Sequence, residues 1–350
     1  MRQLLLICSA VIGGYLLMTA GMILPWLFGP MIAAVLFSKF SKKQIIWPKI
    51  LGNLGLFILG AQIGATFTKE VVMDIKYDAV NIIVLNILLL AAAVLLSLLF
   101  AKMVDCTFET ALLSSIPGAL SQMIIMAEEN DRANLLIVTL SQTSRLLFVI
   151  IIVPLVSSLN ASETTQAAAE RVSSVFHMLS LSEILMIAAL ALALYLLMKK
   201  IHFPVPELLA PIFAIIGWNL STELTFSIPY MWIAGAQVMF GIRIGLQMYS
   251  LSNQLSIRLF AGIVVQNLLL VGATIVIVIL FTRFTVHPFN DLFLSAAPGG
   301  MAQIIVVGLE TRANVAMISS YHIFRIFFIL LVIAPLVQYI LNKRQIDNSF

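Results

Sequence analysis

The chain is 350 residues long, 61% hydrophobic and 10% charged, with a formal net charge of +4. Soluble domains carry about 25% charged residues, so lipid rather than water is the expected surrounding of this chain. Its two cysteines, Cys8 and Cys106, exclude a disulfide framework and a CxxC metal site. The basic residues lie mainly in short loops between apolar runs, a pattern typical of membrane insertion rather than of nucleic-acid binding.

The apolar runs predict membrane helices along the whole chain, because a bilayer core is crossed by about 20 apolar residues. The first run, from Leu4 to Met18, is followed at once by another run and by no small-residue cleavage site, so we expect a retained span and not a signal peptide. The segments are roughly 4–22, 24–38, 50–67, 79–101, 110–127, 134–157, 184–198, 206–220, 230–248, 259–282, 292–309 and 313–341.

The longest polar stretch, 158–182, divides the chain into a first membrane repeat at 1–157 and a second at 183–350. Many short patterns recur in the two parts, in the same order, at an offset of 180 or 181, and such regular recurrence indicates internal duplication. The matching pieces include Leu27-Phe28-Gly29-Pro30 with Leu208-Leu209-Ala210-Pro211, Gly60-x-x-x-Gly64 with Gly241-x-x-x-Gly245, Asn86 with Asn267, Ser115-Ile116-Pro117-Gly118 with Ala296-Ala297-Pro298-Gly299, and Arg145 with Arg325.

Loop charges indicate how the two repeats are oriented, since cytoplasmic loops carry an excess of Lys and Arg. If all twelve segments cross the membrane, ten loop cations lie inside and seven outside. If 110–127 and 292–309 are re-entrant, the division becomes twelve against five, which favours an inverted arrangement with five crossings in each repeat. The predicted fold is therefore an all-α, polytopic transmembrane bundle of two inverted repeats, each with a Pro-Gly broken or re-entrant helix, and twelve parallel spans are the alternative.

The Pro-Gly pairs are the sharpest candidates for a binding site. Proline removes a backbone donor, glycine frees the backbone, and lipid cannot satisfy the groups released by the break. Two breaks at matching positions point to a central site, and half-helix N-termini favour anions. The candidate substrate-binding residues are Pro117, Gly118, Ser121, Gln122, Arg145, Pro298, Gly299, Gly300, Gln303 and Arg325. A structural kink is the alternative interpretation of the breaks.

Arg145 and Arg325 lie near the middle of long apolar runs, where a permanent charge must face the protein interior or a cavity. Each could bind or gate an anion, or could hold the carbonyl groups freed by the helix break. Arg243, which matches Gln62, is a third candidate for burial, and a side chain at the rim that extends to the membrane interface is the alternative. For Asn86 and Asn267 the favoured interpretation is hydrogen bonding between helices.

The repeated unit resembles the AbrB family of bacterial integral membrane proteins, of the duplicated kind, over nearly the whole chain. The resemblance is carried by the Leu-Phe-Gly-Pro segment at 27–30, Leu59-Gly60-Ala61-Gln62-Ile63-Gly64, the first Pro-Gly segment with Gln122, and their second-half counterparts ending in Met301 and Arg325. The family name implies a role in regulating gene expression, and some members carry the label of ammonia monooxygenase. The four histidines are scattered, so no metal site or cofactor is expected to support that label.

The leading functional hypothesis is a secondary transporter or permease for a small, anionic solute, in the bacterial inner membrane and without enzymatic activity. A membrane protein that regulates gene expression indirectly, by sensing or moving a metabolite, is the alternative. The expected partners are the lipid bilayer and a small-molecule or ion substrate, with a homodimer left open and no direct contact with nucleic acid.

Overall fold

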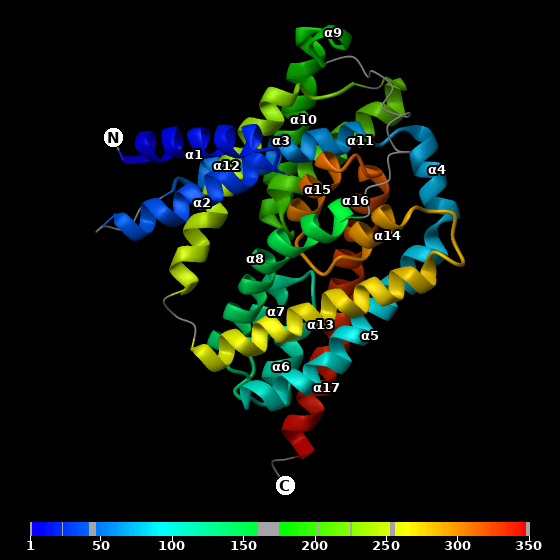
Figure 1. The fold of residues 1–350 in the computed structure, drawn as a ribbon. Coiled ribbons are helices and arrows are strands. Elements are labelled where there is room, and N and C mark those ends of the chain that lie inside the picture. Colours follow the sequence, from blue (N-terminus) through cyan, green and yellow to red (C-terminus); the bar gives the residue numbers. More distant parts are fainter. Residues whose placement is uncertain are drawn as a thin grey trace. The chain divides into compact units, whose positions relative to one another are not determined.

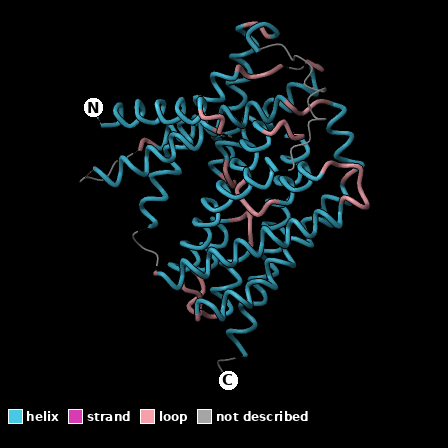
Figure 2. The backbone as a smooth tube through the Cα atoms, viewed as in Figure 1, coloured by secondary structure: helices cyan, strands magenta, loops and turns pink. Residues whose placement is uncertain are grey.

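A computed structural model describes residues 2–22, 24–41, 47–159, 175–201, 203–224, 226–252 and 256–347. Within these ranges the chain forms helices joined by short loops and contains no β-strand, which confirms the all-α fold class (Figure 2). The central part of the predicted polar linker, residues 160–174, lies outside the described residues.

The helices follow one another along the chain with few long connections (Figure 1). Their bounds are α1 (Arg2–Thr19), α2 (Pro25–Phe40), α3 (Lys49–Ala65), α4 (Lys69–Tyr77), α5 (Ala79–Val104), α6 (Phe108–Ser115), α7 (Leu120–Glu128), α8 (Leu135–Leu159), α9 (Val175–Met178), α10 (Leu181–Lys200), α11 (Pro206–Thr222), α12 (Tyr230–Ser252), α13 (Ile257–Phe281), α14 (Phe289–Ala296), α15 (Met301–Glu310), α16 (Val315–Phe328), the π-helical turn η2 (Ile329–Ile333) and α17 (Ala334–Asp347).

Among the described residues, six helical stretches are long and apolar enough to cross a membrane, as expected of a multi-pass membrane protein. They are α1, α5, α8, α10, α13 and the continuous stretch Val315–Leu341. A further candidate is the pair α3 and α4, which together pass the same test but are bent by 82° at the break between them. The segments at 24–38 and 206–220, short in the sequence, correspond to α2 with 16 residues and α11 with 17.

Contacts divide the chain into two units, and each unit combines parts from both halves of the sequence. Unit 1 comprises Met1–Tyr77, Ala161–Asn253 and Ile305–Ala316, and unit 2 comprises Asp78–Asn160, Gln254–Ile304 and Met317–Phe350. This spatial division differs from the predicted repeats at 1–157 and 183–350, each of which is continuous in the sequence. A unit built from both halves requires the halves to fold together.

In unit 1, α2 packs on α12 and α11 packs on α3, so each of these contacts joins a helix from the first half of the sequence to one from the second half. The contact between α3 and α11 depends on Gly60 and Gly64. A Cβ atom at Gly60 would lie 2.4 Å from the Leu208 carbonyl oxygen, and one at Gly64 would lie 2.9 Å from that of Ile212. Glycine is required at both positions because backbone atoms already occupy the space that a side chain would need.

The contact between α12 and α2 depends on glycines in the same way. A Cβ atom at Gly241 would lie 2.6 Å from the carbonyl oxygen of Leu27, and one at Gly245 would lie 2.3 Å from that of Met31. The glycine pairs of one half therefore contact the helices that carry the Leu-x-x-Pro segments of the other half. The structure thus brings together two patterns whose contact the sequence alone did not indicate.

The Arg243 side chain is exposed, which agrees with the rim position and not with burial. It lies on α12 and donates to Asn53 Oδ1 over 3.5 Å, while the Asn53 amide donates to Glu207 over 3.3 Å. A long guanidinium side chain can place its charge at the protein surface even when its Cα atom lies mid-helix. The matching Gln62 has a different role and accepts a hydrogen bond from the backbone N–H of Ile228 over 2.8 Å.

In unit 2, α5 and α13 run side by side (Figure 1). They are antiparallel, because Arg258 at the start of α13 pairs with Asp105 after the end of α5, and donates to the carbonyl of Met103 over 3.0 Å. Gly262 permits a close approach, since a Cβ atom there would lie 2.5 Å from Val104.

The segment that contains α6 and α7 folds back on itself. Before α6, the Thr107 hydroxyl donates to the carbonyl oxygen of Arg132 over 2.8 Å. The backbone N–H of Asn134, just before α8, donates to Thr110 in the first turn of α6 over 2.9 Å. The two ends of the broken segment therefore meet, which is the geometry expected of a re-entrant hairpin. Inversion of the second repeat stays a prediction.

We predict that alanine at Gly60 or Gly245 destabilises unit 1, because the new Cβ atom would overlap a backbone carbonyl oxygen. Overpacking of this kind costs about 1–3 kcal/mol. Gly217 and Gly235, on α11 and α12, are matched controls, since a Cβ atom added at either would have no neighbour within 4 Å. Alanine there should leave the thermal midpoint in detergent unchanged or raise it, since alanine favours helix by about 1 kcal/mol. Equal midpoints for all four variants would refute the close approach.

The hairpin predicts that cysteines placed at Asp105 and Asp131 react with an impermeant maleimide from the same side of the membrane. Arg283, which follows the opposite end of α13, should react from the other side and serves as the control. Native Cys8 and Cys106 are replaced first. Burial raises the pKa of the Cys106 thiol to about 11, so the native thiol should itself react slowly at neutral pH. Labelling of positions 105 and 131 from opposite sides would show that α6 and α7 together cross the bilayer.

Candidate functional site

Both Pro-Gly segments interrupt their helices at the predicted positions. The first helix stops at Ser115 and resumes at Leu120, and the second stops at Ala296 and resumes at Met301. In the first break Gly118 has a φ of 106°, a conformation that favours glycine over other residues. In the second, the Gly299 N–H donates to the carbonyl of Ala297 over 3.0 Å, which closes a tight turn.

Arg145 on α8 satisfies the carbonyl groups at the first break. Its guanidinium donates to the carbonyl oxygen of Ser114 and, over 3.1 Å, to that of Ile116. The Nε atom donates to the side-chain oxygen of Asn267 on α13 over 3.3 Å. The Arg145 side chain is 2% exposed, so these bonds replace contacts with water.

Arg325 on α16 makes the corresponding bonds at the second break. Its two terminal nitrogens donate to the carbonyl oxygens of Ser295 and Ala297, each over 2.8 Å. The Nε atom donates to Asn86 on α5 over 2.7 Å. These contacts match those of Arg145 at an offset of 180 or 181 residues. In each case the arginine bonds the break of its own half and the asparagine of the other half.

These bonds agree with the interpretation that the arginines hold the carbonyl groups freed by the breaks. They also agree with the interpretation of Asn86 and Asn267 as interhelical partners. Each asparagine donates to its own helix, at Ile82 and Ile263 respectively, and so presents its oxygen to the guanidinium. A direct role of Arg145 and Arg325 in substrate binding stays a prediction.

Gln142 and His322 are two residues of this site that the sequence analysis did not select. The Gln142 amide donates to the carbonyls of Leu113 and Ile116 over 2.7 and 3.0 Å. His322 Nε2 lies 3.0 Å from the Leu294 carbonyl oxygen, and a ring nitrogen facing a carbonyl must be the donor. Gln142 and His322 lie 180 residues apart, so the repeat offset was a signal that could have identified both. The match was not evident in the sequence because the two residue types differ.

The breaks pack against the arginine-bearing helices of the opposite halves. A Cβ atom at Gly118 would lie 3.2 Å from Arg325 and from Ile329. One at Gly299 would lie 2.5 Å from Val149, which follows Arg145 by one turn of α8. Unit 2 therefore contains both breaks and both arginines as one connected group, and all ten residues predicted for the site belong to this unit.

The polar side chains after the two breaks differ in exposure. Ser121 is exposed and Gln122 is half-buried, whereas Gln303 is 8% exposed. The Gln303 side-chain oxygen folds back over the turn, where it would lie 2.2 Å from a Cβ atom at Gly300. The first break is thus the more accessible of the two.

The site has an excess of positive charge among the described residues. None of the ion pairs among the described residues includes Arg145 or Arg325, whose partners are neutral carbonyl and amide groups. The C-terminal ends of α6 and α14 offset this charge only in part through their dipoles. The helix that resumes at Leu120 has no side-chain cap, so its first amides add further positive potential.

Several buried hydroxyl groups around the breaks form no hydrogen bond within the described part of the chain. A buried hydroxyl without a partner costs about 1–3 kcal/mol, so such groups favour binding of a polar ligand or water. They are Ser114, Ser141, Ser144 and Ser295. No cluster of three or more His, Cys, Asp or Glu side chains suited to a metal ion occurs in the described ranges.

A second polar cluster of unit 2 lies around Asp78, the N-cap residue of α5. Asp78 accepts hydrogen bonds from Tyr321 and Asn81, each over 2.5 Å, and pairs with His287 over 3.2 Å. Tyr321 precedes Arg325 by one turn of α16, so this cluster fixes the same helix that holds the second break.

Comparison with known proteins identifies the family of the chain. The family model described as transition state regulatory protein AbrB matches residues 26–341. The chain belongs to the AbrB family. The matched range includes both breaks and both buried arginines.

Two similar proteins cover almost the entire chain. "Uncharacterized protein YhjN" of Bacillus subtilis (strain 168) is 25% identical over 96% of this chain and 92% of its own length. A protein of Escherichia coli (strain K12), whose name calls it a candidate regulator AbrB, is 23% identical over 90% of this chain and 89% of its own length.

The hydrogen bond between Arg325 and Asn86 predicts energetic coupling between the two side chains. In a double-mutant cycle, Asn86→Leu and Arg325→Met should be non-additive by about 1.5–3 kcal/mol, the range for hydrogen bonds to charged groups. Asn86→Leu combined with Arg145→Met is the matched control, since Arg145 bonds Asn267 instead. Unfolding free energies in detergent provide the measurement. Equal coupling in both cycles would contradict the specific pairing.

Proposed function

We propose that this AbrB-family protein is a secondary transporter or permease for a small anionic solute. The observation that carries the proposal is the pair of buried guanidinium groups at two helix breaks, with no carboxylate partner in the described residues. A charge buried without an ionic partner favours an ion of opposite sign. The uncapped start of α7 supports the same choice of ligand.

The substrate would contact the amides at the start of the helices that follow the breaks, with Ser121, Gln122 and Gln303 as hydrogen-bond donors. Arg145 and Arg325 would act mainly by electrostatic attraction, because much of their donor capacity already serves the carbonyl groups. In this proposal the two repeats are inverted, the site lies near the middle of the bilayer, and the protein is located in the bacterial inner membrane.

The proposed role is non-enzymatic and involves no cofactor and no direct nucleic-acid contact. The names of the family and of the Escherichia coli relative favour one alternative, a membrane protein that regulates gene expression indirectly. The two functions are compatible if transport of a metabolite changes the signal that a separate regulator detects.

Purified protein in liposomes tests the proposal, with carboxylates, phosphate and sulfate as candidate anions. Gln122→Ala and Gln303→Ala should each reduce uptake by about tenfold or more, the equivalent of one hydrogen bond to a charged ligand. Gln247→Ala on α12 is the matched control and should leave uptake unchanged. Uptake of cations alone, or full activity of both site variants, would overturn the proposal.

Expression profiling then separates the two functions. In cells that lack the protein, a variant without uptake should fail to restore gene expression if regulation depends on transport. Restoration of gene expression by that variant would favour sensing without transport.

A further inference from the structure

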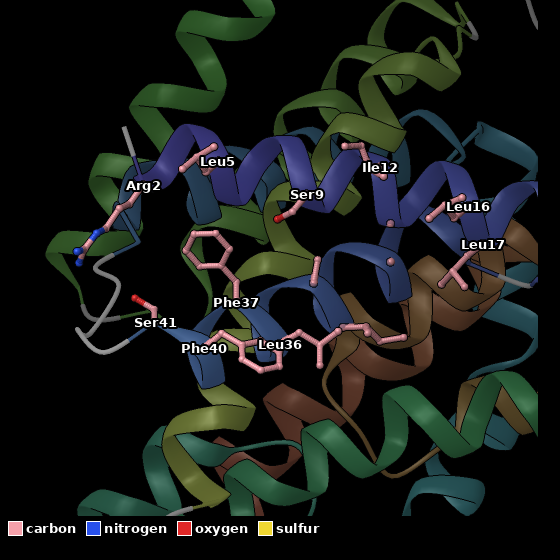
Figure 3. Close-up of a pocket in the computed structure, with 14 residues that line it drawn as sticks. Arg2, Leu5, Ser9, Ile12, Leu16, Leu17, Leu36, Phe37, Phe40 and Ser41 are labelled. Atoms are coloured by element: carbon pink, nitrogen blue, oxygen red, sulfur yellow. The ribbon is translucent and has the colours of Figure 1, made fainter.

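An open apolar groove lies between α1 and α2, with a volume of about 950 Å³ (Figure 3). Its walls are apolar side chains, among them Leu5, Ile12, Leu36 and Phe40. Ser9 is a polar residue on the wall, and its hydroxyl already donates to the Leu6 carbonyl over 2.9 Å. The long middle of the groove therefore offers apolar contact only.

Glycines bring α1 and α2 into contact within the groove, whose lining continues past them to Leu16 and Leu17. A Cβ atom at Gly13 would lie 3.0 Å from the Gly29 carbonyl oxygen, and one at Gly29 would lie 2.2 Å from the Gly14 nitrogen. The helices thus touch at these glycines, and larger side chains hold them apart toward the Arg2 end. Leu17 follows Arg2 by 15 residues, or about 22 Å along a helix, which is within the roughly 30 Å bilayer core.

The mouth of the groove is basic. Arg2 lines it next to Ser41, at the same end of the two antiparallel helices (Figure 3). Lys39 is exposed in the last turn of α2, and Lys42 and Lys43 follow in the sequence. In the loop-charge topology this end faces the cytoplasm, where the leaflet surface is negative.

We propose that this groove is a binding site for one anionic phospholipid. The phosphate would lie at Arg2 and Lys39, and an acyl chain would lie along the groove towards Leu16 and Leu17. Cations at the membrane surface attract anionic headgroups, and apolar walls are compatible with an acyl chain, so the charge at the mouth would determine which lipid binds.

The second half of the sequence lacks the basic pair. At an offset of 180 or 181 residues, Arg2 corresponds to Ser182 or Glu183 and Lys39 corresponds to Asn219 or Leu220, none of which is basic. The two halves have therefore diverged in charge at this position.

Native mass spectrometry of the full chain, released from nanodiscs of equal parts phosphatidylglycerol and phosphatidylcholine, tests the proposal. The wild type should retain one phosphatidylglycerol in preference to phosphatidylcholine. Arg2→Gln with Lys39→Gln should reduce this preference by about fivefold for each cation removed. Lys199→Gln with Lys200→Gln is the matched control, because it removes two cations at the end of α10 and should keep the preference.

Ser9→Phe fills the groove and should abolish retention of the lipid. The substitutions of Arg2 and Lys39 are at exposed positions and should preserve the fold, so they remain informative if Ser9→Phe destabilises the protein. Equal retention of the two lipids by the wild type would overturn the proposal. So would an unchanged preference in Arg2→Gln with Lys39→Gln, or a lipid-free dimer that Ser9→Phe separates, which would identify a second copy as the occupant.

Discussion

The bond from a buried arginine to the carbonyl groups at each helix break is the interaction on which unit 2 depends. A break in an apolar helix releases backbone groups that lipid cannot satisfy. The planar fork of a guanidinium spans two carbonyls, those of Ser295 and Ala297 for Arg325, and leaves Nε for Asn86. A lysine has the charge but not this geometry. The break, the arginine and the asparagine of the other half therefore form one structural group.

The same group gives the site its electrostatic character. Carbonyl dipoles stabilise the two guanidinium charges without neutralising them, so the surroundings of the breaks stay positive. A binding site for an anion can thus arise from residues whose first role is structural. Two alternative interpretations of each arginine followed from the sequence, one structural and one functional. In such an arrangement the same arginine can have both roles.

Unit 1 is held together by different means. Its corresponding helices meet through glycines against backbone carbonyls, with almost no space left at Gly60 or Gly245. Its polar contacts are less symmetric, since Gln62 accepts from a backbone amide while the matching Arg243 is exposed. Close packing fixes the positions of these helices, and the differences between the halves appear at this pair and at the groove between α1 and α2.

The sequence by itself determined the helical fold class, the membrane character, the positions of both breaks and the pairing of patterns at a fixed offset. These features follow from composition and from the local chemistry of proline and glycine. Only the tertiary structure decided what the patterns contact: Gly245 against Met31, Arg325 against Asn86, and Gln142 and His322 as equivalent donors. It also placed Arg243 at the surface. Such contacts join residues more than a hundred positions apart or depend on side-chain direction, and neither periodicity nor hydropathy encodes which helix faces which.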